Sequence, residues 1–183
     1  MRWDQLFGDL EGQLAHEERR DLDLEVADRT RRERALIGLH ERLLATLDGM
    51  GSVELRLRPG LSIAGRVHDV GADWLLLGEP VEQAALVPFG AVLHVVGLGE
   101  HAATGRALPR RFGFGQALRG LSRDRAVVTL VDAVGGEVTG TIDTVGSDLL
   151  DLSEHPADLP RRARHVTSRR SVPFAAIALV RKR

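Results

Sequence analysis

The chain of 183 residues repeats a segment of itself, and this duplication limits its fold more than any other feature of the sequence. Residues 65–77 align with residues 140–152 at an offset of 75, with six of thirteen positions identical. Residues 87–92 align with 172–177 at an offset of 85, with four of six positions identical. We therefore expect two copies of one supersecondary unit. The second copy carries ten additional residues between its two motifs, within 153–171.

Each copy has the apolar pattern of short β-strands. Val53, Leu55 and Leu57 alternate with charged residues, which is the period of a half-buried strand. Pro88 and Pro173 interrupt pairing after a fourth strand, because proline has no N–H to donate to a ladder. A fifth strand follows in both copies. The sequence therefore predicts two small five-stranded antiparallel barrels.

Two details of the third strand lead to further expectations. Gly71 and Gly146 precede it, and we expect both to adopt a positive φ in a tight turn. Trp74 and Leu76 make its second face apolar in the first copy. That face is therefore expected to be covered.

Helix-forming residues precede both copies. Residues 3–47 carry two apolar stripes and predict either one long helix or two helices joined near Asp21. A shorter helix is expected over 116–123. The predicted fold class is thus α+β, mainly β. The predicted parts are an N-terminal helical arm (1–48), a first barrel (49–97), a linker with a short helix (98–125) and a second barrel (126–183).

A helix, five short strands and a one-turn break before the fifth strand resemble the Sm-like barrel superfamily, which includes the Sm and Hfq proteins; SH3-like barrels have similar spacing. The matching pieces are Gly60 and Gly65 with Val67, the leucines of the third strand, and the segment 87–96. The resemblance covers 36–96 and 116–181 and implies two Sm-like barrels. The whole chain also looks like a family of proteins from high-GC actinobacteria, a likeness that implies no activity.

Many Sm-type proteins bind single-stranded RNA through the loops before the third and fifth strands. In this chain those loops span 70–73, 88–90, 145–148 and 173–175, and they contain Asp73 and Asp148 but no Arg, Lys or Asn. The family's RNA-contacting Asn is missing from both copies. The resemblance therefore does not extend to the family's RNA contacts.

Composition points away from several kinds of chemistry. The chain has no cysteine, which excludes disulfides, thiolate metal sites and cysteine nucleophiles. Its seven histidines show no spacing typical of a metal site, and Gly113–Gly115 resembles a phosphate-binding loop without a third glycine in register. We therefore expect no enzyme, no metal and no cofactor. No apolar run is long enough to span a membrane, so we expect a cytoplasmic protein without membrane contact.

The net charge of −1 conceals an uneven distribution. Residues 161–183 hold eight basic side chains and no acidic one. Clustered guanidinium groups attract phosphates, although a charge run can also be a solvated face. The candidate residues for binding nucleic acid or another anion are Arg161, Arg162, Arg164, Arg169 and Arg170.

The N-terminal stripe is the candidate interaction surface, formed by Trp3, Leu6, Phe7, Leu10 and Leu14. Its apolar side must be buried against the same chain, a second copy or another protein. The leading interpretation is a non-enzymatic tandem Sm-like barrel protein that acts as a protein-interaction or assembly module, with a protein partner or self-association. The alternative is a regulator that binds RNA or DNA through the arginine-rich face of the second barrel.

Overall fold

The computed structural model describes residues 3–47, 49, 51–78, 80–102, 112–159 and 161–183, with side chains described from His16 onward except at 17, 18, 21 and 82. It divides into two compact units, Met1–Gly38 and Leu39–Arg183.

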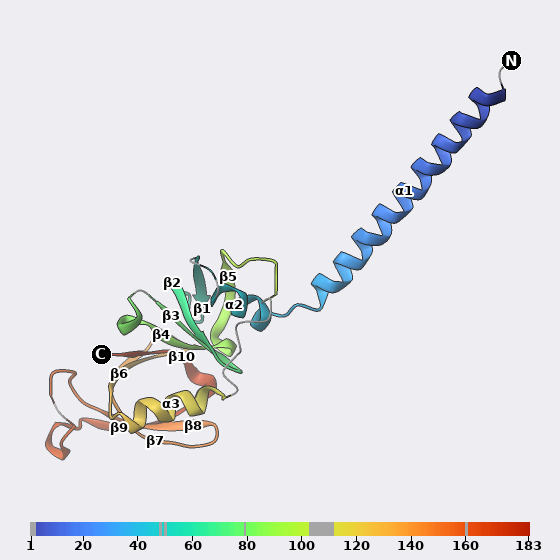
Figure 1. The fold of residues 1–183 in the computed structure, drawn as a ribbon. Helices are drawn as coiled ribbons and strands as arrows, with labels where there is room; N and C mark the ends of the chain where they lie inside the picture. Colours follow the sequence, from blue (N-terminus) through green and yellow to red (C-terminus); the bar gives the residue numbers. More distant parts are fainter. Residues whose placement is uncertain (1–2, 48, 50, 79, 103–111, 160) are drawn as a thin grey trace. The chain divides into compact units, whose positions relative to one another are not determined.

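The first unit is a single helix, α1 (Trp3–Ala35) (Figure 1). Ion pairs one turn apart support it, with Arg32 lying 2.6 Å from Asp28 and Arg29 lying 3.1 Å from Glu33. Neither predicted alternative holds. The helix runs through Asp21 without interruption, so a joint there is wrong, and a single helix over 3–47 is wrong because the break comes at residues 36–38, which end in a glycine. None of the described helices is both long enough and apolar enough to cross a membrane.

The second unit contains a mainly antiparallel β structure with two helices. Within the described residues, ten strands form one sheet, and helix α2 (Leu39–Leu47) and helix α3 (Phe114–Arg123) precede its two halves. The strands are β1 (Ser52–Leu57), β2 (Leu61–Val70), β3 (Trp74–Gly78), β4 (Ala85–Pro88), β5 (Val92–Val96), β6 (Val127–Asp132), β7 (Glu137–Val145), β8 (Leu149–Glu154), β9 (Ser168–Pro173) and β10 (Ile177–Lys182). Short 3₁₀ turns are η1 (Val81–Gln83), η2 (Phe89–Ala91), η3 (Ala163–His165) and η4 (Phe174–Ala176). The predicted α+β, mainly β class is confirmed.

The two halves repeat one arrangement of strands. The strand order is β5-β1-β2-β3-β4 in the first half and β10-β6-β7-β8-β9 in the second. A bulge leaves His68 unpaired in β2 and Asp143 unpaired in β7, again 75 residues apart. Leu43 of α2 and Leu118 of α3, also 75 residues apart, are both fully buried. The duplication seen in the sequence is therefore a duplication of strand pairing and of core positions.

The halves share one continuous sheet. Strand β4 of the first half pairs antiparallel with β10 of the second, placing Leu86 opposite Val180 and Ala85 opposite Arg181. The sheet is not closed into a barrel, and β5 and β9 are its two outer strands. The two separate closed barrels that were predicted are therefore not confirmed. Beyond its pairing with β3, strand β4 of the first copy pairs with β10 of the second copy, not with another strand of its own copy.

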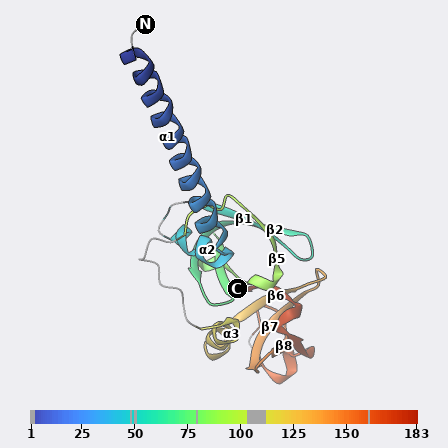
Figure 2. The same ribbon diagram turned by 90° about the vertical axis from the view of Figure 1, so that its right-hand side faces the viewer.

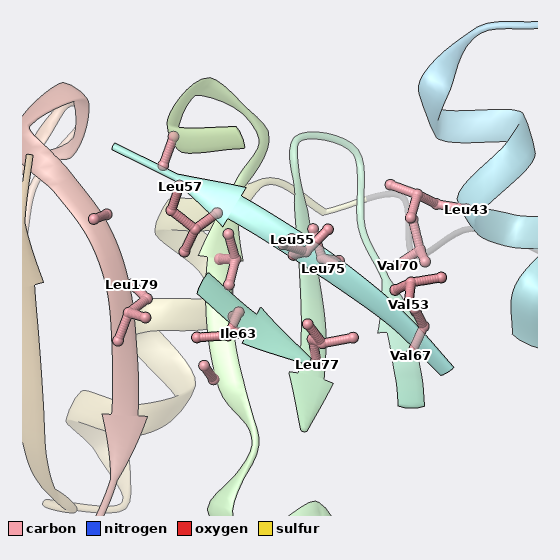
Figure 3. Packing of buried hydrophobic residues seen from close by; sticks show 14 of the residues in the cluster. Leu43, Val53, Leu55, Leu57, Ile63, Val67, Val70, Leu75, Leu77 and Leu179 are labelled. Carbon is pink, nitrogen blue, oxygen red and sulfur yellow. The ribbon is translucent and has the colours of Figure 1, made fainter. Parts of the chain in front are cut away.

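The pairing of β4 with β10 is buried on both faces of the sheet. Leu179 of β10 belongs to the core of the first half, whereas Leu86 of β4 belongs to the core of the second. Figure 3 shows the first core, in which side chains of α2 and β1–β3 gather and Leu179 lies at one end. A strand buried on both faces needs apolar residues at successive positions, which both strands have.

Helix α3 covers part of the sheet. It packs against β7, as both views show (Figures 1 and 2). Trp74 of β3 belongs to the same buried cluster as Phe114 and Leu118 of this helix. Its indole N–H donates to the carbonyl of Phe112 at 3.1 Å, and the two rings lie 5.6 Å apart. The expected cover over the second face of β3 is therefore present.

The turns before β3 and β8 differ from the prediction. Neither Gly71 nor Gly146 has a positive φ. A Cβ on Gly71 would lie 2.0 Å from Nε1 of Trp74, so this glycine makes room for the buried indole. A Cβ on Gly146 would lie no closer than 3.4 Å to Leu149, which is ordinary contact.

The pair allows a matched test. Gly71→Ala should lower the free energy of unfolding by about 1–3 kcal/mol, because the held indole cannot move aside without strain. Gly146→Ala should change it by less than about 0.5 kcal/mol. Urea unfolding of both variants measures the difference, and equal effects would contradict the role given to Trp74.

Candidate functional site

The predicted arginine cluster lies on the segment that joins β8 to β9 and on β9 itself. The additional residues of the second copy form the connection 155–167, which includes η3. Arg161, Arg162 and Arg164 belong to this connection, and Arg169 and Arg170 belong to β9. The structure therefore brings all five to one end of the second half.

Arg161 is held by the sheet. The bulge in β7 leaves Asp143 unpaired and re-aims its side chain, as bulges commonly do. Asp143 then accepts hydrogen bonds from Nε of Arg161 at 2.6 Å and from the hydroxyl of Ser153 at 2.6 Å. These contacts tie the connection to β7 and β8.

Arg170 is also paired. Its Nε and Nη2 lie 2.9 Å and 2.8 Å from one carboxylate oxygen of Glu154, which also accepts from the hydroxyl of Ser168 at 2.6 Å. Arg162, Arg164 and Arg169 are exposed, and Nε of Arg164 donates to Nε2 of His165 at 3.0 Å. Two of the five arginines are thus neutralised by the chain's own acids, and binding of nucleic acid stays a prediction.

Three carboxylates beside these arginines have lowered pKa values. Burial raises the pKa of Asp143, but hydrogen bonds from Arg161 and Ser153 and the charges of Arg161 and Arg169 outweigh it. Hydrogen bonds to the carboxylates lower the other two pKa values, from Ser171 and Thr144 for Asp151 and from Ser168 and Arg170 for Glu154. All three groups therefore favour the folded state more strongly when ionised.

Ser153 and His155 lie near this network without forming a nucleophile and base. The Ser153 hydroxyl donates to Asp143, while Nε2 of the buried His155 lies 2.8 Å from the hydroxyl of Thr141. Nδ1 of His155 lies 2.9 Å from the carbonyl of Pro156, and because a carbonyl only accepts, Nδ1 carries the proton. These groups hold the start of the connection against β7.

At the segment Gly113–Gly115, where α3 begins, a carboxylate of the chain already binds the helix start. Oδ1 of Asp73 accepts a hydrogen bond from the backbone N–H of Phe114 at 2.6 Å, and a Cβ on Gly113 would lie 3.3 Å from that oxygen. A carboxylate at this helix start satisfies a free N–H and repels phosphate. Sequence reasoning missed this role of Asp73, because its partner is 41 residues away. Among the described residues, no cluster of His, Asp and Glu could hold a metal.

Strand β5 is an exposed apolar edge that sequence reasoning also missed. It is the outermost strand beside β1, and it carries no formally charged side chain. Leu93 is 55 % exposed and Val96 is 56 % exposed. A groove of about 340 Å³ borders it, lined by Leu39, Arg42 and Leu98 among others. The only sign of it in the sequence was the run Val-Leu-His-Val-Val, which is mainly apolar and has no formally charged residue.

The opposite edge is polar. Strand β9 has the sequence Ser-Arg-Arg-Ser-Val-Pro, and most of it is exposed. Charged side chains on an outer strand discourage pairing with another strand. The two edges of the sheet therefore differ in their capacity to pair.

The other candidate surface lies outside the described side chains. The backbone of Trp3, Leu6, Phe7, Leu10 and Leu14 belongs to α1, and their side chains are not described. Farther along α1, Leu22, Leu24 and Val26 are each about 60 % exposed. The stripe stays a predicted interaction surface.

Comparison of the chain with protein-family models, with curated proteins and with solved structures finds no match.

The contact between Arg161 and Asp143 gives a pH-dependent prediction. At pH 7, Arg161→Gln should cost about 1 kcal/mol of unfolding free energy, because a partly buried, charge-assisted hydrogen bond is lost. The lowered pKa of Asp143 makes this contribution present above about pH 4 and lost as the pH falls through its folded pKa. The cost of the variant should therefore shrink towards pH 2.

Arg162→Gln is the matched control, because Arg162 is exposed on the same connection. It should change the unfolding free energy by less than about 0.5 kcal/mol at any pH. Urea titrations between pH 2 and pH 7 make the comparison. A cost for Arg161→Gln that does not vary with pH would contradict the assigned ion pair.

Proposed function

We propose that this chain is a non-enzymatic tandem Sm-like protein that acts as a protein-interaction or assembly module, and that strand β5 is its principal binding edge. The observation that carries this proposal is the contrast between two equivalent strands. Strand β10 is the repeat counterpart of β5; it pairs with β4 and is buried over its first four residues. Strand β5 has the same place in its half, and no strand of the described residues pairs with its outer edge.

The same bulge occurs in both strands. Leu93 of β5 and Ala178 of β10, 85 residues apart, are each left unpaired opposite the first strand of their half. Ala178 is fully buried at the junction, whereas Leu93 is more than half exposed. The strand edge through which β10 joins the first half of the sheet therefore has an exposed counterpart on β5.

Several features support the Sm-like part of the proposal. Each half follows a helix, uses the same strand order and has a 3₁₀ turn immediately before its fifth strand. Gly65 and Gly140 lie where the second and third strands approach closely, because a Cβ there would come within 2.8 Å and 2.1 Å of backbone atoms of residues 78 and 153. Both halves thus share the features on which the resemblance rests.

The polar network of the second half supports a structural role for its reactive residue types. The hydroxyl of Ser153 and both ring nitrogens of His155 take part in the bonds that hold the connection 155–167. Among the described residues, each buried side-chain nitrogen or oxygen has a hydrogen-bond partner. We therefore assign Ser153 and His155 a structural role, which is to hold the connection 155–167 through hydrogen bonds.

Site-specific photo-crosslinking in the chain's native cells tests the proposal. A photoreactive residue in place of Leu93 should give a discrete adduct of higher mass. The same residue in place of Val134, which is 87 % exposed in the turn between β6 and β7, is the control and should give none. If position 93 gives no more adduct than position 134, β5 is not a binding edge and the proposal fails.

A further inference from the structure

We propose that the partner of the β5 edge is a second copy of this chain, with the two β5 strands paired antiparallel across a two-fold axis at His94. This inference rests on the proposed function and names its partner. It is carried by the open edge, by its lack of charge and by the polar character of the opposite edge.

The chain already joins the two halves of its sheet by pairing strands at their edges. At the junction of β4 and β10, Leu86 and Leu179 enter different cores, so the paired strands are covered on both sides. On β5 the position equivalent to Leu179 is His94, and its neighbour Leu93 is exposed. The first half therefore presents an edge of the kind that this chain pairs.

Strand β9 of a second copy is a poor occupant of that edge. It is the counterpart of β4, but Arg169, Arg170 and Ser171 stand at the positions of Ala84, Ala85 and Leu86. Pairing in the manner of the junction would bring Arg170 and its ion pair with Glu154 out of water. Taking such a pair out of water is costly, and strand pairing alone supplies no new partner for its charges.

Strand β5 of a second copy meets neither obstacle. An antiparallel pair centred on His94 sets Val92 opposite Val96 of the second copy and Leu93 opposite Val95, with no formally charged residue on either strand. The bordering groove, lined by Leu39, Arg42 and Leu98, leaves space for side chains of the second copy. Of the two outer strands in the described part of the sheet, β5 is thus the uncharged and mainly apolar one.

The interface is small, so the dimer should be weak. Five residues of edge strand and the adjoining groove bury less than a typical stable interface, which puts the dissociation constant at roughly 1–100 μM. Sedimentation equilibrium of the purified full-length chain from about 1 to 300 μM covers this range.

The first experiment compares two matched variants by sedimentation. Leu93→Lys with Val96→Lys should weaken dimerisation at least tenfold, since lysine on an outer strand opposes pairing. Val134→Lys replaces an apolar side chain that is even more exposed, in the turn between β6 and β7, and should leave dimerisation unchanged. Both substitutions replace exposed residues, and thermal unfolding verifies that each variant is folded.

The second experiment reads the register directly. The chain has no cysteine, so His94→Cys introduces a single thiol. In the proposed pairing the introduced thiols of the two copies face each other at cross-strand distance, and mild oxidation should give a disulfide-linked dimer. Val134→Cys is the control and should remain monomeric under the same conditions.

The outcomes separate this inference from the function on which it rests. A chain that stays monomeric at about 300 μM, and whose His94→Cys variant forms no disulfide, overturns the second copy as partner, even if position 93 crosslinks to another protein in cells. A dimer that persists in the double lysine variant places self-association elsewhere, such as on α1, and equally overturns the inference. Loss of crosslinking at position 93 in cells would refute the proposed function itself.

Discussion

The antiparallel pairing of β4 with β10 is the interaction on which the rest of the fold depends. At this point the sheet changes the face that it turns towards a core, because Leu86 is buried with the second half and Leu179 with the first. Breaking the pairing of β4 with β10 would therefore expose apolar side chains in both halves. The duplicated unit of about 60 residues, which is marginal by itself, gains its remaining burial from its neighbour in the same chain.

The two copies share a core and differ at their edges. From α2 to β3 and from α3 to β8 the equivalent residues are separated by a constant 75 positions, and buried residues such as Leu43 and Leu118 coincide. Beyond β8 the second copy inserts its connection and exchanges the apolar β4 sequence for the arginine-rich β9. The arginines that stood out in the sequence therefore belong to a part that has diverged, and two of them hold that part in place through Asp143 and Glu154.

The sequence allowed prediction of what depends on short-range pattern. Alternation placed β1, and the repeat carried that assignment to β6, where Val128 and Leu130 are buried as Val53 and Leu55 are in β1. What it could not supply were relations between distant strands. Consecutive apolar residues in β4 and β10 are equally compatible with closing each barrel and with joining the two halves. The partners of Asp73 and Arg161, 41 and 18 residues away, were likewise beyond local pattern. The sequence singled out Gly71 as a special position. The cause, which is contact with the indole of Trp74, is a tertiary contact that local pattern does not show.

The unequal edges also limit the kind of assembly that the sheet can enter. A β5 edge that paired with β9 of the next chain would leave a new β5 and a new β9 at the ends, and a heterologous contact of this kind continues until a ring closes or a fibre grows. Arg169 and Arg170 make that contact unfavourable. When an uncharged β5 pairs with β5 of a second copy, the β5 edges of both copies are used in the same contact, because a two-fold contact is identical on both sides. In the proposed dimer, each copy would therefore end in the polar strand β9, whose arginine side chains oppose further strand pairing.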